Sequence, residues 1–179
     1  MASGKSKKYR ALILCCGRMD RGDDAIGPLC AAALEERRVP ARVLSGEASE
    51  LLDAWQVAEK VIVVDAMATG RASPGTVHRF DAAEPGSPFE TGGYRPRGPA
   101  LAQATKLGRV LKCLPPTLIL IGLEAESFDW AATLSPAVAE GMAALVEAVE
   151  QEWRRLASVV PARPMRYSAA QDNPPPAAE

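Results

Sequence analysis

The chain has 179 residues, of which 47% are hydrophobic and 24% are charged, and its formal net charge at pH 7 is −1. This length fits one domain with a sizeable core, and the near-neutral charge gives no electrostatic basis for binding nucleic acid or an anionic membrane. No apolar run approaches the ~20 residues of a membrane span, and Ala11–Cys16 is too short for a signal peptide. We therefore expect a cytoplasmic protein.

The composition divides the chain into a folded domain and two tails. Residues 1–8 are rich in lysine and are expected to form a flexible tail, and residues 158–179 are rich in proline and alanine and are expected to be disordered. The folded domain is expected to span residues 9–157. Four cysteines lie in apolar segments without the repeated spacing of a metal site, so we expect reduced core thiols; they are Cys15, Cys16, Cys30 and Cys113.

Apolar runs typical of buried strands alternate along the chain with the apolar spacing of helices. The first half predicts strand Tyr9–Cys16, a helix from Asp24 to about Arg37, strand Ala41–Leu44, helix Leu51–Val57 and strand Val61–Val64. The second half predicts an edge-like strand Thr76–Phe80, a loop from Asp81 to Gly98, helix Pro99–Cys113, strand Thr117–Gly122, and a helix that Ser135 and Pro136 open and that ends near Leu156. This order predicts an α/β three-layer sandwich, with a mostly parallel, twisted five-stranded sheet and helices on both faces.

Acidic residues follow two strands that are expected to be neighbours in this sheet. The loop after the first strand carries Asp20, Asp23 and Asp24, and Asp65 follows the third strand. Ligands of open parallel sheets bind beyond the carboxyl ends of the strands, where the strand order reverses, so Asp24 and Asp65 are predicted to converge there. The start of a helix favours the ionised form of Asp24, whereas burial raises the pKa of Asp65 unless a cation lies beside it. A divalent cation bound by both carboxylates would favour the ionised form of Asp24 and of Asp65 alike.

Structural interpretations of the same residues stay open. In the alternative to a cation site, Asp23 or Asp24 only caps the helix and Asp65 only terminates its strand. The single histidine, His78, lies within the expected fourth strand, where a structural role is favoured over a catalytic one. The sequence contains no phosphate-binding loop, dinucleotide fingerprint or serine-hydrolase elbow.

Several short motifs in register extend from about Ala11 to Leu156. They are the segments GDDAIGP at 22–28, VVDA at 63–66, PGTV at 74–77, LPP at 114–116, IGLE at 121–124 and LSPAV at 134–138. In order and spacing, this set resembles the nickel-iron hydrogenase maturation proteases.

The resemblance implies a peptidase that removes the C-terminal extension of a hydrogenase large-subunit precursor after nickel has been inserted. The precursor is then the partner of a protein expected to be monomeric, and the nickel arrives with the substrate rather than as a permanent cofactor. Members of this family recognise nickel through two acids and a histidine. The two acids fall on Asp24 and Asp65, which become the predicted catalytic and metal-binding residues.

The third metal-binding position differs from the family pattern, because the family's histidine falls on Arg97. Arginine has no lone pair to donate to a metal, so we expect Arg97 to bind the substrate, to pair with Asp24 or Asp65, or to lie on the surface. Cys15 and Arg18 also stand where the family usually has glycine and asparagine. Three functions remain open: a maturation endopeptidase with an altered nickel site, a non-catalytic relative that binds the precursor as an assembly factor, and an unrelated α/β protein that binds a small molecule.

Overall fold

The computed structural model describes residues 9–84 and 100–158, which form the predicted α/β sandwich. The elements follow in the order β1 (Tyr9–Cys16), a short 3₁₀ helix η1 (Gly22–Ala25), α1 (Ile26–Glu36), β2 (Ala41–Leu44), α2 (Ala48–Trp55), β3 (Ala58–Met67), β4 (Val77–Asp81), α3 (Ala100–Val110), β5 (Thr117–Glu124) and α4 (Pro136–Ser158). No helix in these two ranges is both long and apolar enough to cross a membrane. The expected tails and most of the expected loop 81–98 lie outside the described residues.

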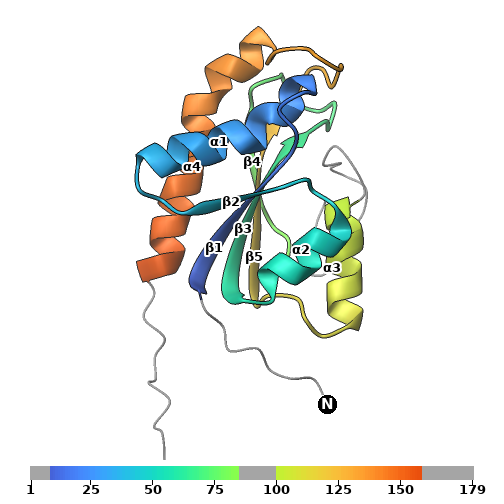
Figure 1. Cartoon of the computed structure of the whole chain (residues 1–179), viewed down its shortest axis with the longest axis vertical. Coiled ribbons are helices and arrows are strands. Elements are labelled where there is room, and N and C mark those ends of the chain that lie inside the picture. The colour runs from blue at the N-terminus through green and yellow to red at the C-terminus, as the bar shows by residue number, and fades with distance from the viewer. Residues whose placement is uncertain (1–8, 85–99, 159–179) are drawn as a thin grey trace, which may run out of the picture.

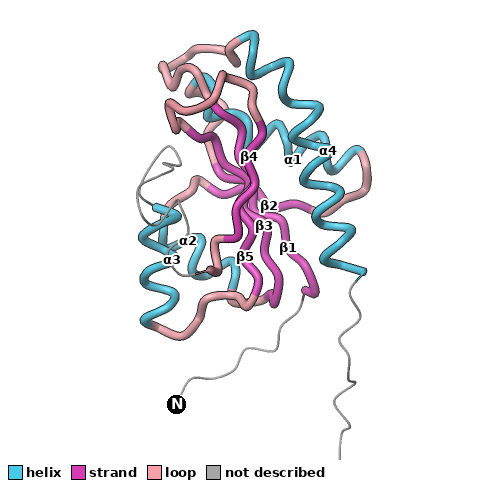
Figure 2. Tube along the Cα trace, turned by 180° about the vertical axis from the view of Figure 1, so that it is seen from behind, coloured by secondary structure: helices cyan, strands magenta, loops and turns pink. Residues whose placement is uncertain are grey.

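The five strands form one sheet in the order β2-β1-β3-β5-β4. All neighbouring pairs are parallel except β4 and β5. The strand β4 lies at the edge of the sheet, as the sequence indicated, and its antiparallel direction was not predicted. Helices α1 and α4 cover one face of the sheet, and α2 and α3 cover the other (Figures 1 and 2). The strand order reverses at β1, because β2 lies on one side of β1 and β3 lies on the other. The predicted ligand position, between the carboxyl ends of β1 and β3, therefore exists in this topology.

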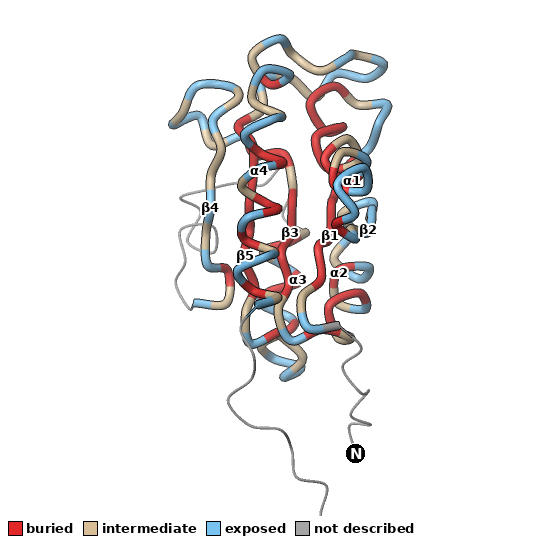
Figure 3. The backbone as a smooth tube through the Cα atoms, turned by 90° about the vertical axis from the view of Figure 1, so that its left-hand side faces the viewer, coloured by how far each residue is buried: buried red, intermediate tan, exposed pale blue. Residues whose placement is uncertain are grey.

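The inner strands are buried on both faces, as Figure 3 shows by their red colour. On β3, Ile62, Val64 and Ala66 belong to the core beneath α1 and α4, whereas Val61 and Val63 belong to the core beneath α2 and α3. This explains why β1, β3 and β5 are nearly continuous apolar runs rather than alternating ones.

Two predicted boundaries need correction at the carboxyl end of the sheet. The third strand does not end at Val64, because its pairing with β5 continues through Asp65↔Gly122 to Met67↔Glu124. Asp65 therefore lies within β3 rather than after it. The helix predicted from Asp24 begins as the 3₁₀ turn η1, and its α-helical part starts at Ile26. The other described elements agree with prediction to within a few residues, and β1 and β2 agree in full.

Two glycines allow α1 to begin directly against the end of β1. A Cβ atom at Gly27 would lie 2.0 Å from the carbonyl oxygen of Cys16. A Cβ atom at Gly17, whose φ is 138°, would lie 2.0 Å from the carbonyl oxygen of Asp24. No side chain fits at either distance, so glycine at both positions brings η1 onto the carboxyl end of β1.

Candidate active site

Asp24 lies in η1, at the carboxyl edge of the sheet. Its side chain is buried, with 1% of its surface exposed. Because Gly17 packs closely against the Asp24 carbonyl group, the Asp24 backbone is fixed beside the residue that follows β1. The 3₁₀ helix η1 also packs against β3. A buried carboxyl group is therefore held between the ends of the two strands where the topology predicts a ligand.

Asp65 reaches the same edge from the next strand. Cys15 pairs with Val64, so Cys16 and Asp65 are the next neighbours along β1 and β3. Burial raises the pKa of the Cys16 thiol, and the nearby Asp65 carboxylate raises it further. Asp65 itself is partly exposed at the surface. Desolvation nevertheless raises the pKa of its carboxyl group to about 7, and a hydrogen bond from the Ala66 N–H lowers that pKa by a smaller amount. A pKa near neutral pH is what we expect for a buried carboxyl group that has no cation beside it.

Asp23 has a structural task that distinguishes it from its neighbour Asp24. Its carboxylate accepts hydrogen bonds from the N–H groups of Glu126 (2.8 Å), Ser127 (2.9 Å) and Ser135 (2.7 Å), and from the Ser135 hydroxyl (2.9 Å). Burial alone would raise the pKa of Asp23, but these donors together hold it below its ordinary value. Asp23 thus ties η1 to the loop between β5 and α4, and it caps no residue of its own helix.

Solved structures of hydrogenase maturation proteases share this fold. The HybD protease of Thermococcus kodakarensis superposes with a TM-score of 0.65 at 24% identity, covering 81% of this chain and 99% of that one. The maturating endopeptidase HybD of Escherichia coli gives 0.62 at 26% identity, covering 82% and 93%. The HycI protease of T. kodakarensis gives 0.56 at 21% identity, covering 85% and 95%. No family model and no curated protein sequence matches the chain.

The signature segments at 22–28 and 63–66 lie on η1–α1 and on β3 of this shared fold. In fold, and at 24% and 26% sequence identity, the chain is similar to these hydrogenase maturation proteases.

A buried polar cluster beside this edge was not identified from the sequence. Glu124, at the end of β5 and 2% exposed, accepts hydrogen bonds from the Thr69 N–H and hydroxyl (2.8 Å each) and from the Gly70 N–H (3.0 Å). Its Oε2 also lies 3.1 Å from Nε2 of His78 on β4. The carboxylate therefore joins the loop after β3 to the edge strand. The signal was Glu124 itself, an acid that ends the apolar run of β5 and is paired with Met67, two residues beyond Asp65.

His78 lies closer to Asp65 than its sequence position indicates. Both residues are paired with Gly122 of β5, one from each side, so the three form a row across the sheet. A Cβ atom at Gly122 would meet Sδ of Met67 at 2.1 Å, so the Met67 side chain occupies the space above this glycine. His78 also stacks on Phe80, with ring centroids 6.0 Å apart. The packing agrees with the structural role that the sequence favoured.

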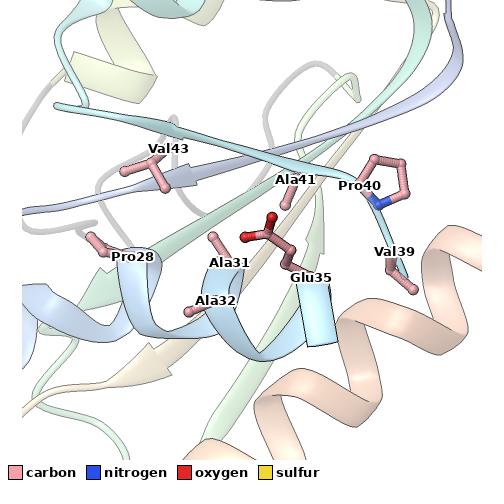
Figure 4. A pocket seen from close by; sticks show the side chains of 8 residues that line it. All are labelled: Pro28, Ala31, Ala32, Glu35, Val39, Pro40, Ala41 and Val43. Atoms are coloured by element: carbon pink, nitrogen blue, oxygen red, sulfur yellow. The ribbon is translucent and has the colours of Figure 1, made fainter. Parts of the chain in front are cut away.

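The remaining predicted position, Arg97, lies outside the described residues. Within residues 9–84 and 100–158, no three histidine, cysteine or acidic side chains are grouped to hold a metal ion. An open groove of about 410 Å³ runs between α1 and the edge strand β2 (Figure 4), and neither candidate acid lines it. Apart from Glu35, its lining is apolar: Pro28, Ala31, Ala32, Val39, Pro40, Ala41 and Val43.

Proposed function

We propose that this protein is the endopeptidase that removes the C-terminal extension of a nickel-iron hydrogenase large-subunit precursor once nickel has been inserted. The observation that carries the proposal is the position of Asp24 and Asp65 at one edge of the sheet, between the ends of β1 and β3, in a chain whose fold is similar to that of the maturation proteases.

The two carboxylates have separate tasks in this proposal. Their oxygens bind the nickel that the precursor carries, which selects precursors already loaded with metal. Nickel accepts oxygen and imidazole ligands, and two fixed carboxylates position it beside the peptide bond to be cut. One of them then accepts a proton from the attacking water, a task that suits a carboxylate held at the edge of a buried site.

The test is to incubate the purified protein with nickel-loaded and nickel-free precursor and to measure the precursor mass. We expect the loaded precursor to lose its extension and the nickel-free precursor to stay intact. An intact loaded precursor would contradict the proposed activity.

Arg97 favours a second candidate function, because an arginine cannot replace a histidine as a metal ligand. Under this alternative the protein binds the precursor and serves hydrogenase assembly without cutting it. A stable complex with no loss of precursor mass would support this function.

An Arg97→His variant tests whether position 97 corresponds to the family's histidine. Restoring an imidazole should tighten nickel-dependent binding of the loaded precursor by roughly tenfold or more, since loss of even a group that hydrogen-bonds to a metal ligand typically weakens metal affinity by roughly 10–100-fold. Titration calorimetry with loaded and nickel-free precursor measures the difference. Equal affinities of the variant and the natural chain would reject the assignment of position 97.

A further inference from the structure

An exposed tryptophan lies between two arginines at the same end of the molecule as the candidate active site. Trp130 is 62% exposed, and Met19, in the loop after β1, is 60% exposed. The guanidinium carbons of Arg18 and Arg21 lie 5.1 and 5.3 Å from the centroid of the Trp130 ring. We call these four residues the loop patch. Both of its loops, β1–η1 and β5–α4, lie at the upper end of the view in Figure 1.

The loop patch is held in place before any partner arrives. The Ala131 N–H donates to the Asp20 carbonyl (2.9 Å), and Nε of Arg21 donates to the Phe128 carbonyl (3.4 Å). The Asp23 carboxylate binds the β5–α4 loop at its two ends, as described above. Cation–π contacts of the two guanidinium groups with the ring also favour this arrangement. A tryptophan that is already ordered loses little conformational entropy on binding, which favours it as an anchor for another protein.

The charges of the patch indicate the chemistry of its partner. Arg18 is paired with Asp20 through contacts of 3.0 and 3.1 Å. Arg21 donates to a backbone carbonyl, and no carboxylate of the described residues forms an ion pair with it. An acidic side chain from outside would complete its interactions with a charge-assisted hydrogen bond. Tryptophan, arginine and methionine are also the residues enriched in the energetic centres of protein interfaces.

The patch is continuous with the candidate active site. The loop that carries Arg18, Met19 and Arg21 runs directly into η1, which carries Asp24. A protein bound at the patch would therefore be held beside the carboxyl ends of β1 and β3, where a segment of its chain could enter the site.

We propose that the loop patch is the docking surface for the folded body of the precursor, through a surface of the precursor that combines an acidic side chain with apolar contacts. This inference rests on the proposed function for the identity of the partner. In this proposal the loop patch recognises the folded precursor, and the two carboxylates recognise its nickel.

The experiment compares four variants for binding and for cleavage of the nickel-loaded precursor. Trp130→Ala should weaken binding at least tenfold and raise KM without changing kcat, and Trp130→Phe should recover most of the affinity. Arg21→Glu should slow association and remove much of its dependence on salt concentration. Leu111→Ala is the matched control, because Leu111 is also 60% exposed but follows α3 at the opposite end of the sheet. It should bind like the natural chain.

The outcomes separate the two proposals. If the natural chain cuts the precursor and Trp130→Ala binds and cuts it equally well, the docking surface is refuted and the proposed function stands. If the natural chain binds without cutting and Trp130→Ala loses binding, the docking surface stands and the peptidase activity fails. If the natural chain does not bind the precursor, both proposals fail.

Discussion

Adjacent acids in η1 have different surroundings, which predict different consequences of substitution. Asp23 accepts four hydrogen bonds from the β5–α4 loop. An Asp23→Asn variant replaces one accepting oxygen with a donor and leaves buried N–H groups unsatisfied, at a cost of about 2–4 kcal/mol. Urea denaturation measures this loss. Asp20→Asn, which loses only an exposed ion pair with Arg18, should leave the urea midpoint nearly unchanged. Equal losses would mean that Asp23 does not anchor the loop.

The raised pKa of Asp65 predicts an unusual dependence of the free energy of unfolding on pH. Its folded-state pKa of about 7 lies above the ordinary value of 3.8, so the folded state holds the proton more tightly than the unfolded state. The contribution of this group to the free energy of unfolding is therefore full below about pH 4 and is lost as pH rises to about 7. Asp65→Asn should be more stable than the natural chain at pH 8, by roughly 2–4 kcal/mol, and equally stable near pH 4. If the free energies of unfolding of the two proteins changed with pH in the same way, ionisation of Asp65 would carry no energetic cost in the folded state.

At the residue scale, topology predicts which side chains lie at one edge of the sheet, whereas roles that depend on distant partners could not be predicted. Asp24 and Asp65 could be selected because parallel strands bring their carboxyl ends to one edge. The role of Asp23 could not, because its donors lie more than 100 positions along the chain. The contact of His78 with Glu124 depends on the antiparallel register of β4 and β5, which the sequence does not specify.

At the scale of elements, the position of η1 depends on Gly27. Its Cβ would overlap the backbone oxygen of Cys16, which cannot rotate away as a side chain could. Gly27→Ala should push α1 away from β1 and destabilise the fold by about 3 kcal/mol, although alanine is the better helix former. Thermal denaturation followed by circular dichroism measures this effect. Ala32→Ser, on the exposed side of the same helix, should change stability by less than about 0.5 kcal/mol. An unaffected Gly27→Ala variant would refute the close packing of α1.

Strands were predicted best where apolar runs have clear ends. β1 and β2 match in full, whereas the third strand was predicted too short at both ends. Its missing residues include Glu59, Lys60 and Asp65, whose polarity is typical of loops. Pairing with β1 at one end, with β5 at the other and with both at Lys60 keeps this polar stretch in the sheet, because its backbone groups gain partners there. This tertiary effect overrides local preference.

At the scale of the whole molecule, the sheet, its helices and the similarity to the maturation proteases agree with the sequence-based expectation. The fold brings three features to the carboxyl end of the sheet: the two candidate acids, the Glu124 cluster and the loop patch. Recognition of metal, on η1 and β3, and recognition of protein, on two loops that hydrogen bonds hold in place, would then occur side by side.

The central claim is that Asp24 and Asp65 act together on one nickel-bearing substrate. The most direct measurement is the rate of precursor cleavage by Asp24→Asn, Asp65→Asn and the double variant, each confirmed as folded at the assay pH. We predict that each single variant loses at least about 100-fold in rate and that the double variant is little slower than either, because groups that act as a unit are not additive. Near-natural rates in both single variants would contradict the claim.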